Sequence, residues 1–295
     1  MTERVGFIGL GIMGRPMALS LLRSGVALSV HARRRESMTP LVEAGATVCA
    51  TPAELAACCD LVITMVSDTP DVEQVILGYD GIIEGIASGS VVVDMTTISP
   101  AATRIIARVL AERGVAMLDA PVSGGEAGAV AGTLSIMVGG ERSAFERCLP
   151  LFEAMGGAIV HVGGSGAGQV CKSCNQVVVG ATIAGVAEAI LLARASGVDP
   201  AKVREALLGG FAGSRILEVH GQRMIDGAFE PGFKARLHQK DMRIVAETAH
   251  ELGLALPTAA LVAQYLNALV GSGRGEEDSA ALYRVVAGMS GRGED

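Results

Sequence analysis

The chain has 295 residues, a length that corresponds to about two domains of ordinary size. Half of the residues are hydrophobic, 19% are charged and 3% are aromatic, which excludes a disordered or collagen-like protein. The formal net charge of −7 argues against a general affinity for nucleic acid or for an anionic membrane surface, because both require a surplus of cations.

The first half of the chain alternates short apolar segments with helical ones, a pattern that predicts a parallel sheet. The expected strands are Arg4–Ile8, Ala27–His31, Leu61–Met65, Val91–Asp94, Ala116–Asp119, Leu134–Val138 and Ile159–His161. Helices are expected over Met13–Ser24, after the capping box Thr51-Pro52-Ala53-Glu54, and from Ser99 to about Arg113. The fold class is therefore α/β, with a doubly wound sheet.

The second half of the chain shows helical periods only. Beyond the glycine-rich segment 163–166 a long helix is predicted from about Gly166 to Ser196, and Asp199-Pro200, Gly209-Gly210 and Leu256-Pro257 separate the helices that follow. We expect an α/β domain over residues 1–164 and an all-helical domain over residues 165–295, joined by that long helix.

The longest uncharged stretch, Ser173 to Ala187, is shorter than the ~20 residues of a membrane span and ends at Glu188. We interpret it as part of a buried helix and expect no membrane association. The apolar run after Arg4 is too short for a signal peptide, and six cysteines in a chain of this length suit reduced thiols. These features predict a cytoplasmic protein.

Two cysteines, Cys171 and Cys174, have C-x-x-C spacing. A redox pair or half of a zinc site is the alternative to two ordinary thiols. No second C-x-x-C and no spaced histidine pair completes a metal site, so we expect no bound metal.

The segment Gly9-Leu10-Gly11-Ile12-Met13-Gly14 matches the pattern G-x-G-x-x-G. It follows a predicted strand and opens a predicted helix, the context in which this pattern binds a dinucleotide pyrophosphate. The alternative is an ordinary glycine-rich turn. We expect residues 1–164 to form a Rossmann-type domain with these six residues at the cofactor.

The end of the second strand predicts which dinucleotide is preferred. NAD sites usually place a carboxylate there, whereas this chain has His31-Ala32-Arg33-Arg34-Arg35. Guanidinium groups bind a 2′-phosphate in bidentate fashion, so Arg33 and Arg34 favour NADP(H). A solvated basic turn is the alternative, and NAD(H) stays possible.

Two further segments are unusual for structure alone. In Asp119–Gly125, Ser123 is followed by Gly124 and Gly125, which predicts a small anion-binding nest of backbone N–H groups. In Gly168–Asn175, Lys172 and Asn175 are spaced i,i+3 and share a helix face. Lys172 is the one charged residue on this apolar helix before Glu188. The alternative interpretation is that its side chain extends along the helix and places the ammonium in solvent.

These segments resemble the β-hydroxyacid dehydrogenase family over nearly the whole chain. The segments that resemble its cofactor, substrate, catalytic and fourth motifs are Gly6–Gly14, Asp119–Gly125, Gly168–Asn175 and Lys240-Asp241. The segments Gly81–Gly85, Gly132–Gly140 and Ala212–Ser214 are similar to the subgroup that reduces tartronate semialdehyde. Several relatives carry Asp near Ala32 and use NAD, so the cofactor preference does not follow from the resemblance.

The resemblance implies roles for individual residues. Lys172 is the general acid, Asn175 holds the substrate hydroxyl or orients Lys172, and Lys240 contacts both cofactor and substrate. The substrate carboxylate is bound by Ser123, Gly124 and Gly125. The remaining cofactor contacts are His31, Met65, Val66, Ser67 and Thr97.

The implied reaction is reduction of tartronate semialdehyde (2-hydroxy-3-oxopropanoate) to glycerate. The alternatives are 3-hydroxyisobutyrate or another short β-hydroxyacid, and succinic semialdehyde or glyoxylate. Imine reduction is disfavoured because relatives that reduce imines usually replace the lysine that this chain keeps at Lys172. A hydroxyacid that carries a phosphate or a sugar is disfavoured because related phosphogluconate enzymes have a much longer helical half. A non-catalytic dinucleotide sensor is the alternative from another class, and Lys172 with Asn175 argues against it.

The segment Val177–Leu192 is hydrophobic almost all round, which predicts a homodimer or homotetramer assembled through the helical half. Ile183, Val186 and Ile190 are expected on the face that a second subunit covers. The alternative is that other helices of the same chain cover this face.

Overall fold

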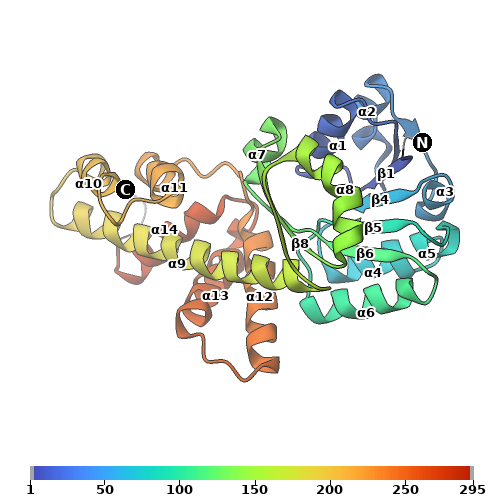
Figure 1. Cartoon of the computed structure of the whole chain (residues 1–295). Helices are drawn as coiled ribbons and strands as arrows, with labels where there is room; N and C mark the ends of the chain where they lie inside the picture. Colours follow the sequence, from blue (N-terminus) through green and yellow to red (C-terminus); the bar gives the residue numbers. More distant parts are fainter. Residues whose placement is uncertain (1–2, 293–295) are drawn as a thin grey trace. The chain divides into compact units, whose positions relative to one another are not determined.

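The computed structural model describes residues 3–292, and the chain separates into two compact units, Met1–Lys172 and Ser173–Asp295 (Figure 1). The first unit contains every strand among the described residues. The long helix α9 (Ala167–Ala195) begins in the first unit and continues in the second.

The first unit is built on one sheet with the order β3-β2-β1-β4-β5-β6-β8-β7, and β9 pairs with the other edge of β8. Its strands are β1 (Val5–Ile8), β2 (Leu28–His31), β3 (Thr47–Val48), β4 (Leu61–Thr64), β5 (Val91–Asp94), β6 (Ala116–Asp119), β7 (Val122–Ser123), β8 (Leu134–Gly139) and β9 (Gly156–Gly163). The strands β1 to β6 are parallel and have the order of a dinucleotide-binding Rossmann sheet, with the switch point between β1 and β4. The predicted doubly wound α/β fold is confirmed.

The strand β8 runs antiparallel to both β6 and β7, and the pairing register of these two along β8 is continuous. The segment β7 therefore extends the line of β6 beyond a break at Ala120-Pro121. Proline has no N–H to donate to a ladder, which explains a break at this position.

Helices cover both faces of this sheet (Figure 1). Those on one face are α1 (Gly14–Arg23), α2 (Thr39–Glu43), α7 (Gly125–Ala131) and α8 (Arg142–Met155); those on the other are α3 (Pro52–Ala57), α4 (Thr69–Leu77), α5 (Ile82–Gly85) and α6 (Pro100–Ala111). Successive residues of a strand point to opposite faces, so Phe7 lies in one core and Ile8 in the other. The central strands are buried on both faces, which is why they read as continuous apolar runs.

Local sequence signals account for several helix starts. Thr51 accepts the Glu54 backbone N–H at 3.1 Å, as the predicted capping box requires, whereas Glu54 accepts from the Ala50 N–H at 2.7 Å, one residue before the N-cap. The helices α2, α4, α5, α7 and α8 were not predicted. Helix α8 carries Pro150 in its interior, a residue that normally marks a helix boundary.

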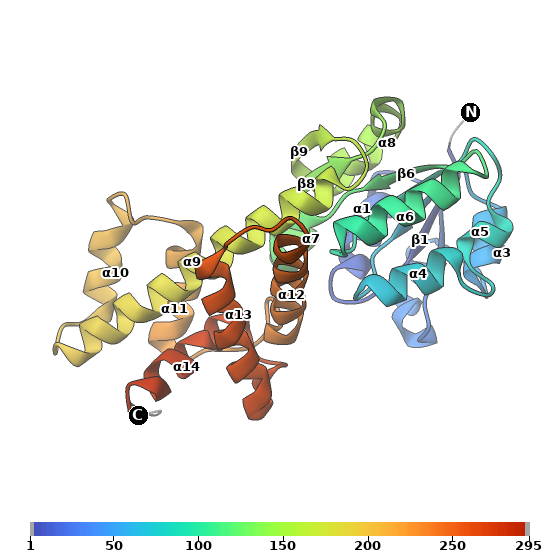
Figure 2. The same ribbon diagram turned by 90° about the horizontal axis from the view of Figure 1, so that it is seen from below.

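The second unit is helical. Its core packs around α9 and comes from α11 (Arg215–Asp226), α12 (Ala235–Glu251), α13 (Pro257–Leu269) and α14 (Leu282–Met289), with α10 (Pro200–Leu208) alongside α11 (Figure 2). Between residues 164 and 292 the only β pairing is one isolated bridge from Lys234 to Asp278, so the all-helical prediction is confirmed.

The apolar face that we expected a second subunit to cover is buried by the chain itself. Ile183, Val186 and Ile190 all lie in the core of the second unit, so that part of the prediction is wrong. Within Val177–Leu192 of α9, the exposed large apolar residues are Val178 and Leu192. Helix α9 is also, among residues 3–292, the one helix long and apolar enough to cross a membrane; 44% of its apolar window is buried, and its residues Ile183, Val186 and Ile190 belong to the core of the second unit.

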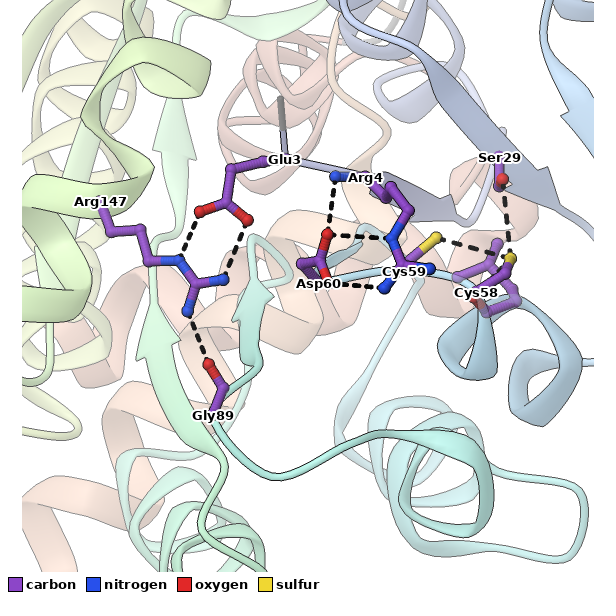
Figure 3. Close-up of polar contacts among 9 residues, drawn as sticks. Glu3, Arg4, Ser29, Cys58, Cys59, Asp60, Gly89 and Arg147 are labelled. Carbon is purple, nitrogen blue, oxygen red and sulfur yellow. Dashed lines mark hydrogen bonds and ion pairs between the residues drawn. The ribbon is translucent and has the colours of Figure 1, made fainter. Parts of the chain in front are cut away.

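Polar contacts fix the amino-terminal edge of the sheet, opposite the edge where the parallel strands end (Figure 3). Arg147 of α8 donates to both carboxylate oxygens of Glu3 at 2.7 and 2.9 Å, and to the Gly89 carbonyl at 2.6 Å. Arg4 pairs with Asp60 at 2.7 Å, and this contact lowers the pKa of Asp60 to about 2. The starts of β1, β4 and β5 are thereby tied together.

We expect Arg147→Met to lower the free energy of unfolding by about 1 kcal/mol, because a bidentate pair and a carbonyl contact are lost at a partly exposed site. The corresponding fall in melting temperature is about 2–4 °C. The matched control is Arg142→Met on the same helix, whose pair with Glu146 is exposed and which should leave the melting temperature within 1 °C or about 0.3 kcal/mol. Equal melting temperatures for the two variants would contradict this account.

Candidate active site

Most of the predicted site residues of the first unit follow the carboxyl ends of its parallel strands. This edge contains the loop Gly9–Gly14 after β1, the segment after β2, residues Met65, Val66 and Ser67 after β4, and Thr97 after β5. In open α/β sheets this edge, at the switch in strand order, is where ligands bind.

The glycines of the first loop show whether a dinucleotide fits. Gly9 has φ +99°, and a Cβ there would overlap the Met65 carbonyl, while a Cβ on Gly14 would overlap the Gly9 carbonyl. A Cβ on Gly11 would meet no protein atom within 4 Å. Thus two glycines are needed by the protein's own packing, and the third leaves open space beside the backbone at the start of α1, where a pyrophosphate would lie.

The basic segment after β2 is exposed. His31 places Nδ1 3.1 Å from the Cys49 carbonyl, which orients its ring at the strand end. Arg33 and Arg34 both face solvent, and the Arg33 guanidinium lies 3.5 Å from the Asp71 carboxylate of α4. One predicted phosphate ligand therefore has an acidic neighbour, which the sequence did not predict.

The segments after β4 and β5 are cross-linked beneath the cofactor edge. The Val66 N–H donates to Thr96 Oγ1 at 3.0 Å. Asp94 Oδ1 accepts from Thr64 Oγ1 at 2.8 Å and from the Thr96 N–H at 3.2 Å. Burial raises the pKa of Asp94 to about 6. Sequence analysis assigned no role to Thr96 or to the Asp94 carboxylate.

Lys172 lies against the segment with the substrate-motif sequence. Its side chain is buried, and Nζ donates to the Val122 carbonyl at 2.8 Å. The neighbouring Gly124 and Gly125 have φ of +132° and +62°, conformations that favour glycine. The fold thus brings Lys172 to the Val122 carbonyl, which directly precedes Ser123 and the two glycines in the chain.

In the second unit a chain of hydrogen bonds connects the other two predicted residues. Asn175 donates to Gln176 Oε1 at 2.7 Å, and Gln176 donates to Asp241 Oδ2 at 2.7 Å. Lys240 Nζ lies 3.0 Å from Asp241 Oδ1. Gln176 and Asp241 are buried and hold Asn175 and Lys240 in place, a role that spacing alone did not reveal.

The helix α9 carries Lys172 and Asn175 one turn apart on one side. Cys171 and Cys174 on the same helix do not form a disulfide bond. Among residues 3–292 no group of three His, Cys, Asp or Glu side chains is arranged to hold a metal ion.

Two family models match the chain. The model described as the NAD binding domain of 6-phosphogluconate dehydrogenase matches residues 4–163. The model described as NAD-binding of NADP-dependent 3-hydroxyisobutyrate dehydrogenase matches residues 166–286.

Similar proteins extend the likeness over the full length. The chain is 47% identical over 287 residues to 2-hydroxy-3-oxopropionate reductase of Escherichia coli (strain K12), covering 97% of this chain and 98% of the relative. The crystal structure of 3-hydroxyisobutyrate dehydrogenase from Salmonella typhimurium is 31% identical with a TM-score of 0.86, and the two chains are covered to 95% and 99%. The structure of Psf3 with NADP+ and 2-OPP is 25% identical with a TM-score of 0.88, covering 96% and 99%.

The fold and these matches define an NAD(P)-binding oxidoreductase that acts on CH–OH groups. The chain belongs to the β-hydroxyacid dehydrogenase family, the group of 3-hydroxyisobutyrate dehydrogenase-like enzymes, as its motifs indicated.

The glycine loop yields a paired test. We expect Gly11→Ala to keep the wild-type melting temperature but to weaken NADPH binding about tenfold or more, because its Cβ enters open space at the pyrophosphate position. Gly14→Ala should lower the melting temperature, because its Cβ overlaps the Gly9 carbonyl. Fluorescence titration with NADPH and thermal unfolding measure both effects; unchanged NADPH affinity in Gly11→Ala would contradict the assignment of the loop.

Proposed function

We propose that this enzyme reduces a short anionic semialdehyde to a hydroxyacid, with tartronate semialdehyde reduced to glycerate as the leading reaction. The observation that carries the proposal is the buried Lys172 ammonium, 2.8 Å from the Val122 carbonyl and beside the Ser123-Gly124-Gly125 segment. The 47% identity to 2-hydroxy-3-oxopropionate reductase supports the choice of substrate.

The chain's own residues supply binding and the proton. Ser123 and the N–H groups of Gly124 and Gly125 bind the substrate carboxylate, which places the aldehyde oxygen toward Lys172. When bound, the reduced nicotinamide supplies the hydride that the aldehyde carbon accepts. Lys172 stabilises the negative charge that develops on the aldehyde oxygen and donates a proton to it, leaving a neutral amine that is reprotonated from water. Asn175 and Lys240, fixed through Gln176 and Asp241, orient the substrate.

Other short β-hydroxyacids, among them 3-hydroxyisobutyrate, form the second candidate group, because the structural relatives include 3-hydroxyisobutyrate dehydrogenases. A non-catalytic dinucleotide sensor is disfavoured by Lys172, because burial of an ammonium is unfavourable and a sensor gains nothing from a proton donor.

The domain assignment follows from the same reasoning. We propose that residues 1–164 bind the cofactor and that residues 165–295 contribute to substrate binding and to assembly. We also propose that the protein is cytoplasmic.

Lys172→Ala should lower kcat for tartronate semialdehyde by about 10²–10⁴-fold, because both the proton donor and the charge at the developing alkoxide are lost. NADPH binding should stay within about threefold, since the loss of one contact distant from the pyrophosphate changes little. The matched control is Lys202→Ala, a lysine on α10 whose ion pair with Glu205 is exposed and whose loss should leave kcat unchanged. A Lys172→Ala enzyme with more than about a tenth of wild-type kcat would refute the assignment.

We propose that NADP(H) is preferred over NAD(H), with Arg33 and Arg34 at the 2′-phosphate. Changing Ala32 to Asp together with Arg33→Ala and Arg34→Ala should shift the preference toward NADH. The new carboxylate accepts from the ribose 2′-OH, and each lost charge-assisted hydrogen bond is worth about 1.5–3 kcal/mol. Arg35→Ala is the control. A wild-type enzyme with higher kcat/KM for NADH than for NADPH would overturn this preference.

We propose that the enzyme is a homodimer or homotetramer assembled through its helical half. The proposed interface now contains the exposed residues Val178 and Leu192 of α9, in place of the buried Ile183, Val186 and Ile190. Light scattering at micromolar concentration should give at least twice the chain mass of 30.1 kDa, and Val178→Glu with Leu192→Glu should lower it. Ile105→Glu, at another exposed apolar position, on α6 of the first unit, is the control and should leave the mass unchanged. A monomeric wild-type protein would refute the proposal.

A further inference from the structure

The helix that carries Lys172 starts against the end of β6. The last residue of that strand, Asp119, is buried, and its two carboxylate oxygens accept from two different N–H groups at the start of α9. Oδ1 accepts from Gly166 at 2.8 Å, and Oδ2 accepts from Gln169 at 2.9 Å. The first N–H groups of a helix have no partner within it, and a carboxylate there is also favoured by the helix dipole. Asp119 therefore caps α9 from a strand far away in the sequence.

Two glycines allow the helix to approach this carboxylate. A Cβ on Gly139 of β8 would lie 2.7 Å from Asp119 Oδ1, and a Cβ on Gly168 would overlap the Asp119 and Met137 carbonyls. Any other residue at either position would push the first turn of α9 away from the sheet. The closeness of this contact is thus built into the sequence.

Gln169 fixes the same turn on a second side. Its side chain is fully buried; Oε1 accepts from the Ile98 N–H at 3.1 Å, and Nε2 donates to the Thr96 carbonyl at 2.7 Å. These two backbone groups flank Thr97, a residue that the resemblance implies as a cofactor contact. Gln169 therefore sets the separation between α9 and this segment.

Lys172 follows Gln169 by three residues, which is about one helical turn. Its Nζ donates to the Val122 carbonyl at 2.8 Å, and Val122 follows Asp119 by three residues. The short segment from Asp119 to Val122 thus holds α9 at two points, the helix start and the lysine. A shift of the helix start would move Lys172 relative to both this segment and Thr97.

We propose that Asp119 and Gln169 are positioning residues that set where the Lys172 ammonium lies relative to the segment Thr96–Ile98, which contains the implied cofactor contact Thr97. The inference rests on the proposed function of Lys172 as proton donor. In this proposal neither side chain contacts substrate or cofactor. Each affects the reaction only through the position of α9.

The test uses variants of the same shape as the native residues. In Asp119→Asn an amide NH2 replaces one acceptor, so either Gly166 or Gln169 loses its partner. In Gln169→Glu the acceptor for Ile98 remains and the donor to Thr96 is lost. Asp199→Asn is the matched control, because the Asp199 carboxylate caps α10, a helix that carries none of the proposed site residues.

We expect Asp119→Asn and Gln169→Glu to lower kcat about 10–100-fold, with KM for the semialdehyde within about threefold, because misplacement by about 1 Å has effects of this size. The single-turnover rate constant for NADPH oxidation at saturating semialdehyde should fall by the same factor as kcat or more, because the chemical step itself becomes slower. Asp199→Asn should change neither quantity. A loss of folded protein would lower only the amplitude of the single turnover and leave its rate constant at the wild-type value, which would overturn the inference.

A second measurement does not depend on activity. The rate at which acetic anhydride labels Lys172, relative to exposed Lys202, should rise at least threefold in both variants, because the ammonium is released from the Val122 carbonyl. An unchanged labelling rate in folded Asp119→Asn and Gln169→Glu would overturn the positioning role. Failure of the wild-type enzyme to reduce any semialdehyde would instead count against the proposed function, and labelling would still decide the positioning role. If Asp119→Asn does not fold, Gln169→Glu carries both measurements.

Discussion

The placement of one buried ammonium is the constraint on which the rest of this structure depends. Lys172 lies in a helix that is otherwise apolar for several turns, and burial of a charge is unfavourable unless polar groups compensate. The Val122 carbonyl supplies such a group at 2.8 Å. A carbonyl accepts from Lys172 Nζ without placing a negative charge beside it.

The geometry around this group explains features that look unrelated in the sequence. The break at Ala120-Pro121 separates β6 from β7 and leaves the Val122 carbonyl within reach of Lys172. The glycines at 139 and 168 let α9 approach the sheet. Thr96 joins the segment after β4 to the segment after β5 and, through Gln169, to α9. The cofactor edge and the helix that carries the proton donor thus form one connected set of hydrogen bonds within the first unit.

Most of the fold could be predicted from local patterns. Continuous apolar strands, the turn at G-x-G-x-x-G between β1 and α1, and the Thr51 N-cap each depend on residues close together in the chain, and the structure contains all three. Helix α8 was not predicted, and it carries Pro150 in its interior, where proline is unusual. Ile183, Val186 and Ile190 were misjudged because periodicity shows that a face is apolar but not whether the same chain covers it. The helices that cover this face, α11 to α14, lie later in the chain.

The site was predictable where a motif carries the chemistry and not where a distant residue does. Lys172 and Ser123 stand in recognisable segments, and the fold brings them together through Val122. Gln169, Gln176 and Asp241 act through partners 65 or more residues away, so no spacing rule identifies them. The exposed Arg33 was found by its position after β2, but its neighbour Asp71 comes from another helix.

The most direct test of the central claim is a comparison of kcat/KM for tartronate semialdehyde, methylmalonate semialdehyde, succinic semialdehyde and glyoxylate, each measured with NADPH and with NADH. The account predicts that tartronate semialdehyde has the highest kcat/KM, by about tenfold or more, a difference of about 1.4 kcal/mol in transition-state binding. A higher value for another substrate in the panel would contradict the proposed substrate. No measurable reduction of any of the four, with the cofactor bound, would contradict the assignment of Lys172 as a proton donor to a semialdehyde.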